Sequence, residues 1–187
     1  MKIENRKSKI NRGFTLIELL IVITLLGILA VAILSAINPI EQINRSRDTS
    51  SRSDAEQLIN AIDRYYATVG YYPWKDAEDP EFFPAPQAFT TVDDDWVDTQ
   101  NVSVLGKLTA EGTAEVKESF TNRIKSSATP LHVYNRGGQG DSTYVCFEPR
   151  SAAFLKEAKD RCDVELPLDY PVDSACPNTG TSYSCLP

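Results

Sequence analysis

The sequence FTLIELLIVITLLGILAVAILSAI occupies residues 14–37 and contains a single charged side chain, Glu18. A helix of these 24 residues is roughly 36 Å long at about 1.5 Å per residue. That length exceeds the hydrocarbon core of a bilayer, which is about 30 Å thick. The stretch therefore predicts a helix that crosses a membrane with some tilt and separates a short N-terminal segment from a long polar body.

A basic segment precedes the apolar stretch. Residues 1–13 contain five cations and one acid, Glu4, for a net charge of +4, whereas residues 14–187 hold 14 cations and 25 acids, for a net charge of −11. Because positively charged flanks of a membrane helix stay in the cytoplasm, residues 1–13 are expected to be cytoplasmic. The body beyond residue 37 is then expected to lie outside, so the precursor is a single-pass membrane protein.

Two other kinds of N-terminal segment share some of these features. A secretory signal peptide usually has an apolar region of about 7–15 residues, and the stretch at 14–37 is longer. A plain membrane anchor fits the length but does not explain Glu18. A carboxylate in a membrane helix costs about 2.5–3.5 kcal/mol at the helix centre, and less near the end. The presence of Glu18 therefore indicates that this helix has a function beyond anchoring the chain in the membrane.

The sequence RGFTLIELL at residues 12–20 resembles the type III signal of prepilins, the precursors of type IV pilins and of type II secretion pseudopilins. The resemblance covers residues 1–37 and continues as a looser match to about residue 73. It implies that a dedicated membrane peptidase cuts between Gly13 and Phe14 on the cytoplasmic side and methylates the new amine of Phe14. Glu18 then becomes the fifth residue of the mature chain, as the family pattern requires.

Electrostatics indicates a role for Glu18 independently of the family resemblance. Cleavage would create a positively charged amine at the end of an apolar helix, where such a charge is costly unless it is paired. Glu18 lies close to its own N-terminus, and in a stack of helices it could also reach the amine of a neighbouring subunit. That pairing would fix the axial register of one subunit on the next, as a lone buried polar group can do in coiled coils.

The fold class predicted for the chain is α+β and pilin-like, with a long N-terminal helix packed on a small antiparallel β-sheet. The first half of this helix is expected to be transmembrane. Four segments are expected in chain order: a cytoplasmic leader at 1–13, a transmembrane and assembly helix at 14–37, an amphipathic continuation at 38–70, and an extracytoplasmic domain at 71–187.

Three local signals predict the second half of the helix. Asn38, Pro39 and Glu41 form a capping-box pattern with proline at the first helical position, which indicates a new helix or a kinked continuation. Gly70 is the expected C-cap. Between them, apolar residues recur three and four positions apart, which is typical of a helix packed on a sheet: Ala55, Leu58, Ile62, Tyr65 and Val69.

The body shows weaker and shorter patterns. Residues 71–100 are rich in proline, aspartate and aromatic residues and are expected to form a long loop. Helical composition is found at 114–126 and 151–162. Short β-strands and one hairpin turn complete the prediction: strands at Val102–Leu105, Leu131–Tyr134 and Thr143–Phe147, and a turn at Gly137–Asp141.

Four cysteines follow the export signal: Cys146, Cys162, Cys176 and Cys185. An even number in an oxidising compartment predicts two disulfides. Of the three possible connectivities, Cys146–Cys162 with Cys176–Cys185 is preferred, because short loops close most easily. The chain has no C-x-x-C pair that would indicate zinc. The family resemblance implies in addition that a disulfide closes the C-terminal region.

Neither a metal nor a cofactor is predicted. The acidic run Asp93–Asp95 lacks the spacing of an EF-hand, and the acids within 163–173 match the calcium loop of major pseudopilins poorly. The acidic body repels nucleic-acid phosphates, and a single histidine, His132, leaves few options for catalysis. Three arginines form the basic stretch of the mature chain and are expected to meet acidic groups of neighbouring subunits rather than lipid phosphates or DNA: Arg45, Arg47 and Arg52.

These features favour a structural protein that is not an enzyme, namely a subunit of a type IV pilus-like filament that is processed by prepilin peptidase and assembled through its N-terminal helix. The alternative is a pseudopilin of a type II secretion or DNA-uptake system, which shares the N-terminal signal. The expected partners are copies of the chain, related pilins, the peptidase, an inner-membrane assembly platform and membrane lipid, and nucleic acid is not expected among them. The chain is expected to leave the membrane when it enters the filament.

The first testable prediction concerns processing. The exported protein is expected to begin at Phe14 and to carry an N-methyl group, because the basic leader ends in the Gly13–Phe14 junction. Intact-mass and N-terminal peptide mass spectrometry checks this outcome. A start at Met1, or one after Ala32 as a signal peptidase would leave it, would contradict the prediction.

Overall fold

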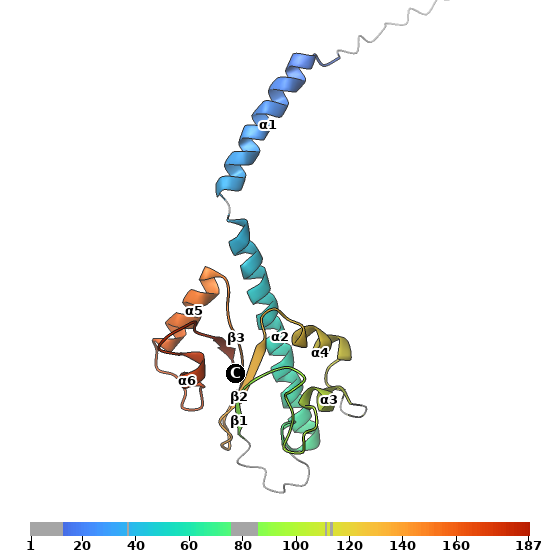
Figure 1. Cartoon of the computed structure of the whole chain (residues 1–187), viewed down its shortest axis with the longest axis vertical. Helices are drawn as coiled ribbons and strands as arrows, with labels where there is room; N and C mark the ends of the chain where they lie inside the picture. The colour runs from blue at the N-terminus through green and yellow to red at the C-terminus, as the bar shows by residue number, and fades with distance from the viewer. Residues whose placement is uncertain (1–12, 37, 76–85, 111, 113) are drawn as a thin grey trace, which may run out of the picture. The chain divides into compact units, whose positions relative to one another are not determined.

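The computed structural model describes residues 13–36, 38–75, 86–110, 112 and 114–187 (Figure 1). The chain divides into two units, Met1–Pro39 and Ile40–Pro187. The second unit is called the head below. The predicted leader spans residues 1–13. Only Gly13 of this segment belongs to the described residues. The architecture is α+β, with an apolar N-terminal helix and a four-stranded antiparallel sheet, as the sequence predicted.

Helix α1 spans Leu16–Ala36 and makes up most of the described part of the first unit. Its few hydroxyl side chains are satisfied locally. The Oγ1 of Thr24 donates to the carbonyl of Ile21 at 2.9 Å, and the Oγ of Ser35 donates to the carbonyl of Ala32 at 2.9 Å. Side chains that bond back to their own helix in this way can enter an apolar medium without an external partner.

Helix α2 spans Pro39–Val69 and begins where the capping-box pattern placed a helix start. Gly70 ends it: its φ is 91°, and its N–H donates to the carbonyl of Tyr66 at 2.8 Å, which is the C-cap geometry glycine favours. The predicted apolar stripe is buried at Ala55, Leu58, Ile62 and Tyr65 and partly buried at Val69. One face of α2 therefore forms part of the main core of the head.

The sheet has the order β1-β2-β3-β4, and each neighbouring pair of strands is antiparallel. Alternate residues of β2 and β3 point toward α2, so Leu131, Val133, Val145 and Phe147 share one core cluster with the stripe of the helix. The strands are β1 Gln87–Thr91, β2 Leu131–Asn135, β3 Thr143–Phe147 and β4 Ser184–Leu186. The predicted strands at 131–134 and 143–147 and the turn between them are confirmed.

The described part of the head contains four further short helices: α3 Val104–Thr109, α4 Glu118–Lys125, α5 Ala152–Cys162 and α6 Val172–Ala175. The predicted strand at Val102–Leu105 is wrong, because this segment opens α3. The Oδ1 of Asp98 accepts the N–H groups of Gln100 and Val102 at 2.9 and 2.8 Å and turns the chain. Ser103 then caps α3 by accepting from the N–H of Gly106 at 3.1 Å.

Strands β1 and β4 are absent from the sequence prediction. β1 lies inside the segment that was expected to be a loop, and the register of its pairing with β2 shifts between Gln87 and Thr90. β4 has only three residues and follows a polar segment. Both are edge strands of the sheet. They are recognised by their hydrogen-bonded pairing with β2 and β3, because their own sequences show no clear alternation of apolar and polar residues.

A buried carboxylate ties α2 to the start of α5. Asp48 is completely buried, and its Oδ2 accepts the N–H of Ser151 at 2.8 Å and the hydroxyl of Ser151 at 2.6 Å. Both oxygens also accept the N–H of Arg150, at 3.0 and 3.1 Å. Because Ser151 is the N-cap of α5, the carboxylate sits where the helix dipole favours negative charge. Glu41 adds a contact with the N–H of Ala152 at 3.2 Å.

The second prediction concerns this contact. Asp48→Ala is expected to lower the free energy of unfolding of the head by about 3 kcal/mol, because it strands two backbone N–H donors and one hydroxyl in the interior. Urea unfolding of the detergent-solubilised chain, followed by the fluorescence of the buried Trp74 and Trp96, measures the change. The matched control is Glu56→Ala on the exposed side of α2, which is expected to change stability by at most about 0.5 kcal/mol. Equal effects of the two substitutions would contradict the prediction.

Candidate processing and assembly site

The expected cleavage junction lies just before α1. Phe14 is 86% exposed, and Gly13 is exposed as well. A Cβ added to Gly13 would meet no atom within 4 Å, and Gly13 is not among the glycines with positive φ. Neither space nor backbone conformation therefore requires a glycine at position 13 in this fold. The junction is accessible, and the reason for its glycine lies outside the packing of the described chain.

The carboxylate of Glu18 is turned back onto the first turn of α1. Its Oε2 accepts the backbone N–H of Thr15 at 2.8 Å and the hydroxyl of Thr15 at 2.9 Å. In return, the N–H of Glu18 donates to the Oγ1 of Thr15 at 3.2 Å. This reciprocal pair is a capping box, with Thr15 at the N-cap and Glu18 three residues later.

Sequence reasoning missed the role of Thr15, although the spacing T-x-x-E at 15–18 is the same signal that located the start of α2. The second carboxylate oxygen, Oε1, makes no hydrogen bond with the described residues. A carboxylate accepts several hydrogen bonds at once, so Glu18 can cap its own helix and still receive a further donor. The expected pairing with an amine is therefore compatible with the capping box.

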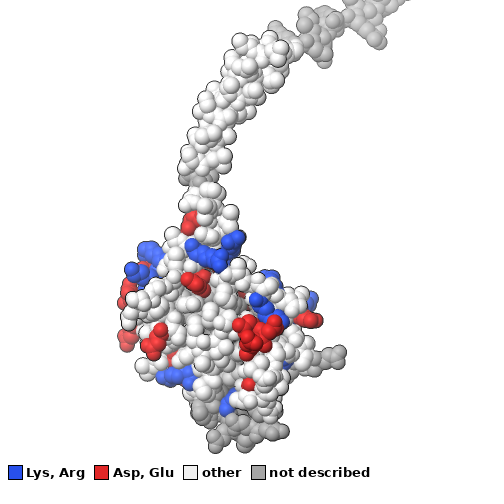
Figure 2. Space-filling model, in the orientation of Figure 1, with Lys and Arg blue, Asp and Glu red and all other residues white. Residues whose placement is uncertain are grey.

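The side surface of α1 is apolar and unburied. Leu16–Ser35 is long and apolar enough to span a membrane, and none of it is buried within the described chain. Among its large side chains, Ile28 is 72% exposed and Leu34 is 69% exposed. Figure 2 shows the visible face of this helix as almost free of charged side chains. Together with its N-terminal position, this surface fits a membrane-anchored precursor.

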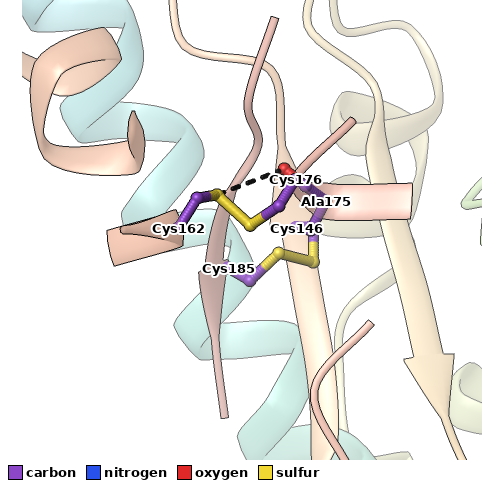
Figure 3. The surroundings of a disulfide bond; sticks show 5 residues. All are labelled: Cys146, Cys162, Ala175, Cys176 and Cys185. Carbon is purple, nitrogen blue, oxygen red and sulfur yellow. Dashed lines mark hydrogen bonds between the residues drawn. A yellow bond between two sulfur atoms is a disulfide. The ribbon is translucent and has the colours of Figure 1, made fainter. Parts of the chain in front are cut away.

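The four cysteines form two disulfides, and no free cysteine is found among the described residues. The pairing is Cys146–Cys185 and Cys162–Cys176, so the preferred connectivity of the sequence analysis is wrong. Figure 3 shows the two bonds near one another, with the sulfur of Cys162 directed toward the carbonyl of Ala175 at 4.0 Å. The shorter loop lies nested inside the longer one.

Sheet pairing explains the error. β4 lies antiparallel to β3, and its register places Cys185 directly opposite Cys146. Opposite residues of neighbouring strands have their Cβ atoms about 4.5–5.5 Å apart, so the register of β3 and β4 by itself places these two side chains next to each other. The shorter loops of the preferred connectivity would save only about 1 kcal/mol of closure entropy. The strand pairing, which sequence spacing does not reveal, outweighs that saving.

The remaining candidate residues do not converge on a catalytic or metal site in the described ranges. No three His, Cys, Asp or Glu side chains come together there in a way that could hold a metal ion. The ring of His132 stacks on Phe89 with centroids 4.8 Å apart, and burial lowers the pKa of this histidine, with Glu148 and Asp93 opposing the shift. Of the three arginines in the basic stretch, Arg52 forms an ion pair with Glu157 of α5 in the same chain.

Comparison with known proteins identifies the N-terminal segment. Residues 8–34 match the family model of the prokaryotic N-terminal methylation motif, which is the prepilin-type signal of type IV pilins and pseudopilins. No curated protein and no solved structure matches the chain. The match covers the junction, the capping box and most of α1, and it leaves the head to be interpreted from its own residues.

The third prediction distinguishes the connectivities. Cys185→Ser is expected to leave the thiol of Cys146 free in the exported protein while Cys162–Cys176 stays closed. Alkylation before reduction, followed by digestion with trypsin and an enzyme that cuts after Tyr183, assigns the free thiol. The matched variant Cys176→Ser is expected to expose Cys162 instead. A free Cys176 thiol in Cys185→Ser would restore the connectivity first expected from loop length.

Proposed function

We propose that the protein is a structural subunit of a type IV pilus-like filament, inserted as a membrane precursor, cut between Gly13 and Phe14, and assembled through α1. The observation that carries the proposal is the apolar surface of α1, which has no burial within the described chain and follows a prepilin-type signal. A helix that is apolar all round needs lipid or other helices around it. The membrane supplies the first surrounding, and copies of α1 supply the second.

The head supports this proposal because its main core contains no residue of α1. Its main core is closed by the stripe of α2 and by the sheet, so α1 remains available for lipid or for other subunits. The prepilin-type motif belongs to a family of structural proteins, not of enzymes. The two nested disulfides close the C-terminal region of the head, which favours a pilin over the pseudopilin that is the second candidate.

Glu18 has two possible roles in such a filament. In the described chain it caps α1 through Thr15, and in a filament its free Oε1 would receive the methylated amine of Phe14 from its own chain or from a neighbour. The second role predicts that the negative charge matters, whereas the first needs only an acceptor. Glutamine at this position of a capping box keeps the acceptor and removes the charge, so the two roles are separable by substitution.

The fourth prediction uses this difference. Glu18→Ala and Glu18→Gln are both expected to insert, to be cleaved and to reduce the sheared-filament fraction at least about tenfold. A buried charge pair broken on one side costs about 3–5 kcal/mol per subunit. Thr15→Ala is the matched control: it removes a helix cap worth about 1 kcal/mol but keeps the charge, so filaments should persist. Membrane-bound and sheared fractions are measured by immunoblot with equal loading of cleaved protein.

Each result has a defined meaning for the proposal. Normal filament yield from Glu18→Gln would show that Glu18 acts only as a cap, and normal yield from Glu18→Ala would remove it from assembly altogether. A cleaved, unaltered chain that never forms sheared filaments, in cells that possess the assembly machinery, would refute the filament proposal and favour the pseudopilin.

A further inference from the structure

The first turns of the head present an exposed apolar face beside an unpaired cation. Ile40 and Ile43 are 68% and 53% exposed. Arg47 is exposed too, and it makes no ion pair among the described residues. The spacing of three and four residues puts these three side chains on one side of α2. They are called the α2 face below.

A hollow of about 240 Å³ adjoins the α2 face at Arg47. It lies between α2 and the segment that follows α4, and its lining is mainly hydroxyl-bearing: Ser50, Ser51, Ser127 and Thr129. Asp54 also lines it, but this carboxylate is paired with Arg123 at 2.8 Å. Burial raises the pKa of Asp54, although Arg123 opposes the shift. The charge in the hollow that has no ion pair among the described residues is therefore the positive one of Arg47, and four hydroxyl-bearing residues line the same hollow.

A second surface with complementary chemistry lies between two cysteines. Residues 163–173, called the acidic loop, are enclosed by the disulfide Cys162–Cys176. Leu168 is 89% exposed and Val164 is 61% exposed. Three carboxylates of this loop make no ion pair with the described residues: Asp163, Glu165 and Asp173.

The acidic loop is held in place before it meets a partner. Its fourth carboxylate, Asp169, accepts the N–H of Ser142 at 2.7 Å and the hydroxyl of Tyr144 at 3.2 Å. The disulfide fixes the two ends of the loop. A protruding leucine on a preorganised loop loses little conformational entropy on binding, which is the condition for an efficient docking element.

The two surfaces lie on different sides of the head. Figure 1 shows α5 and α6 on one side of α2 and α4 on the other. The acidic loop runs from α5 into the start of α6, whereas the hollow is lined by the segment that follows α4. Two different, complementary patches on one subunit generate a head-to-tail contact. Unless its rotation closes a ring, a contact of this kind repeats into an open helical polymer.

We propose that the acidic loop of one copy docks on the α2 face of another copy. In this contact Glu165 enters the hollow and pairs with Arg47, while Leu168 covers Ile40 and Ile43. The proposal rests on the proposed function, since it supplies the filament with a contact between heads in addition to the packing of α1. It also assigns a partner to Arg47 and to Glu165, neither of which forms an ion pair among the described residues.

The fifth prediction is a charge exchange in the full-length chain. Arg47→Glu is expected to reduce the sheared-filament fraction about tenfold, because it sets like charges against each other across the contact. Adding Glu165→Arg to the same chain is expected to restore most of the yield. The matched control is Arg45→Glu, which makes the same charge change on the other side of α2 and is expected to leave the yield unchanged. All three altered positions are exposed, so cleavage and disulfide formation should proceed normally.

A photocrosslink locates the contact independently of filament yield. Leu168 is replaced by benzoylphenylalanine, and irradiation is expected to link it to residues 40–51 of a second copy, as mapped by mass spectrometry. The link should weaken with Arg47→Glu and persist with Arg45→Glu. Crosslinks to another region, no crosslink between copies, or no rescue by the charge exchange would overturn the docking contact. Filaments that form while the crosslink maps elsewhere would refute this contact alone, whereas the lack of any filament from the unaltered chain would refute the filament itself.

Discussion

The buried carboxylate of Asp48 fixes the position of the C-terminal half of the head. Its hydrogen bonds to Arg150 and Ser151 hold the first turn of α5 against α2. Because α5 ends at Cys162, the same contact determines where the shorter disulfide begins. That disulfide encloses the acidic loop. One polar contact on α2 thus leads, element by element, to the surface through which we infer that subunits meet.

Such a contact is stable only because every donor and acceptor in it is matched. A buried charge without partners costs several kcal/mol, whereas Asp48 receives both backbone N–H groups and a hydroxyl at the positive end of a helix. Glu18 shows the same chemistry at the start of α1, where it caps the helix through Thr15. The two carboxylates differ in what remains: Asp48 is enclosed by the head, and Glu18 keeps one oxygen for a donor from outside.

The two helices have different functions because their apolar surfaces are buried to different extents. The stripe of α2 is satisfied by the sheet, so its other faces are free to carry charge. The apolar surface of α1 is satisfied by nothing in the described chain, so it needs a membrane or a bundle of its own kind. A head whose main core contains no residue of α1 can stay intact while α1 exchanges lipid for other subunits, as the proposed filament subunit requires.

Patterns among residues adjacent in sequence predicted much of the secondary structure of this protein. Residues adjacent in the chain determine the length of the apolar stretch, the processing motif, the start and end of α2 and the two central strands. The structure confirms these helices and strands.

Where the outcome depended on partners distant in sequence, local patterns failed. Val102–Leu105 has strand-like composition, but Asp98 turns the chain and Ser103 caps a helix there. β4 forms by pairing with the edge of β3. The register of that pairing, and not the length of the loop, places Cys185 opposite Cys146. The sequence by itself determined the apolar helix α1, the bounds of α2 and the two central strands, because those properties reside in neighbouring side chains. The tertiary structure decided which cysteines bond, which carboxylate is buried and which charges remain unpaired on the surface, because each of these depends on residues that only folding brings together.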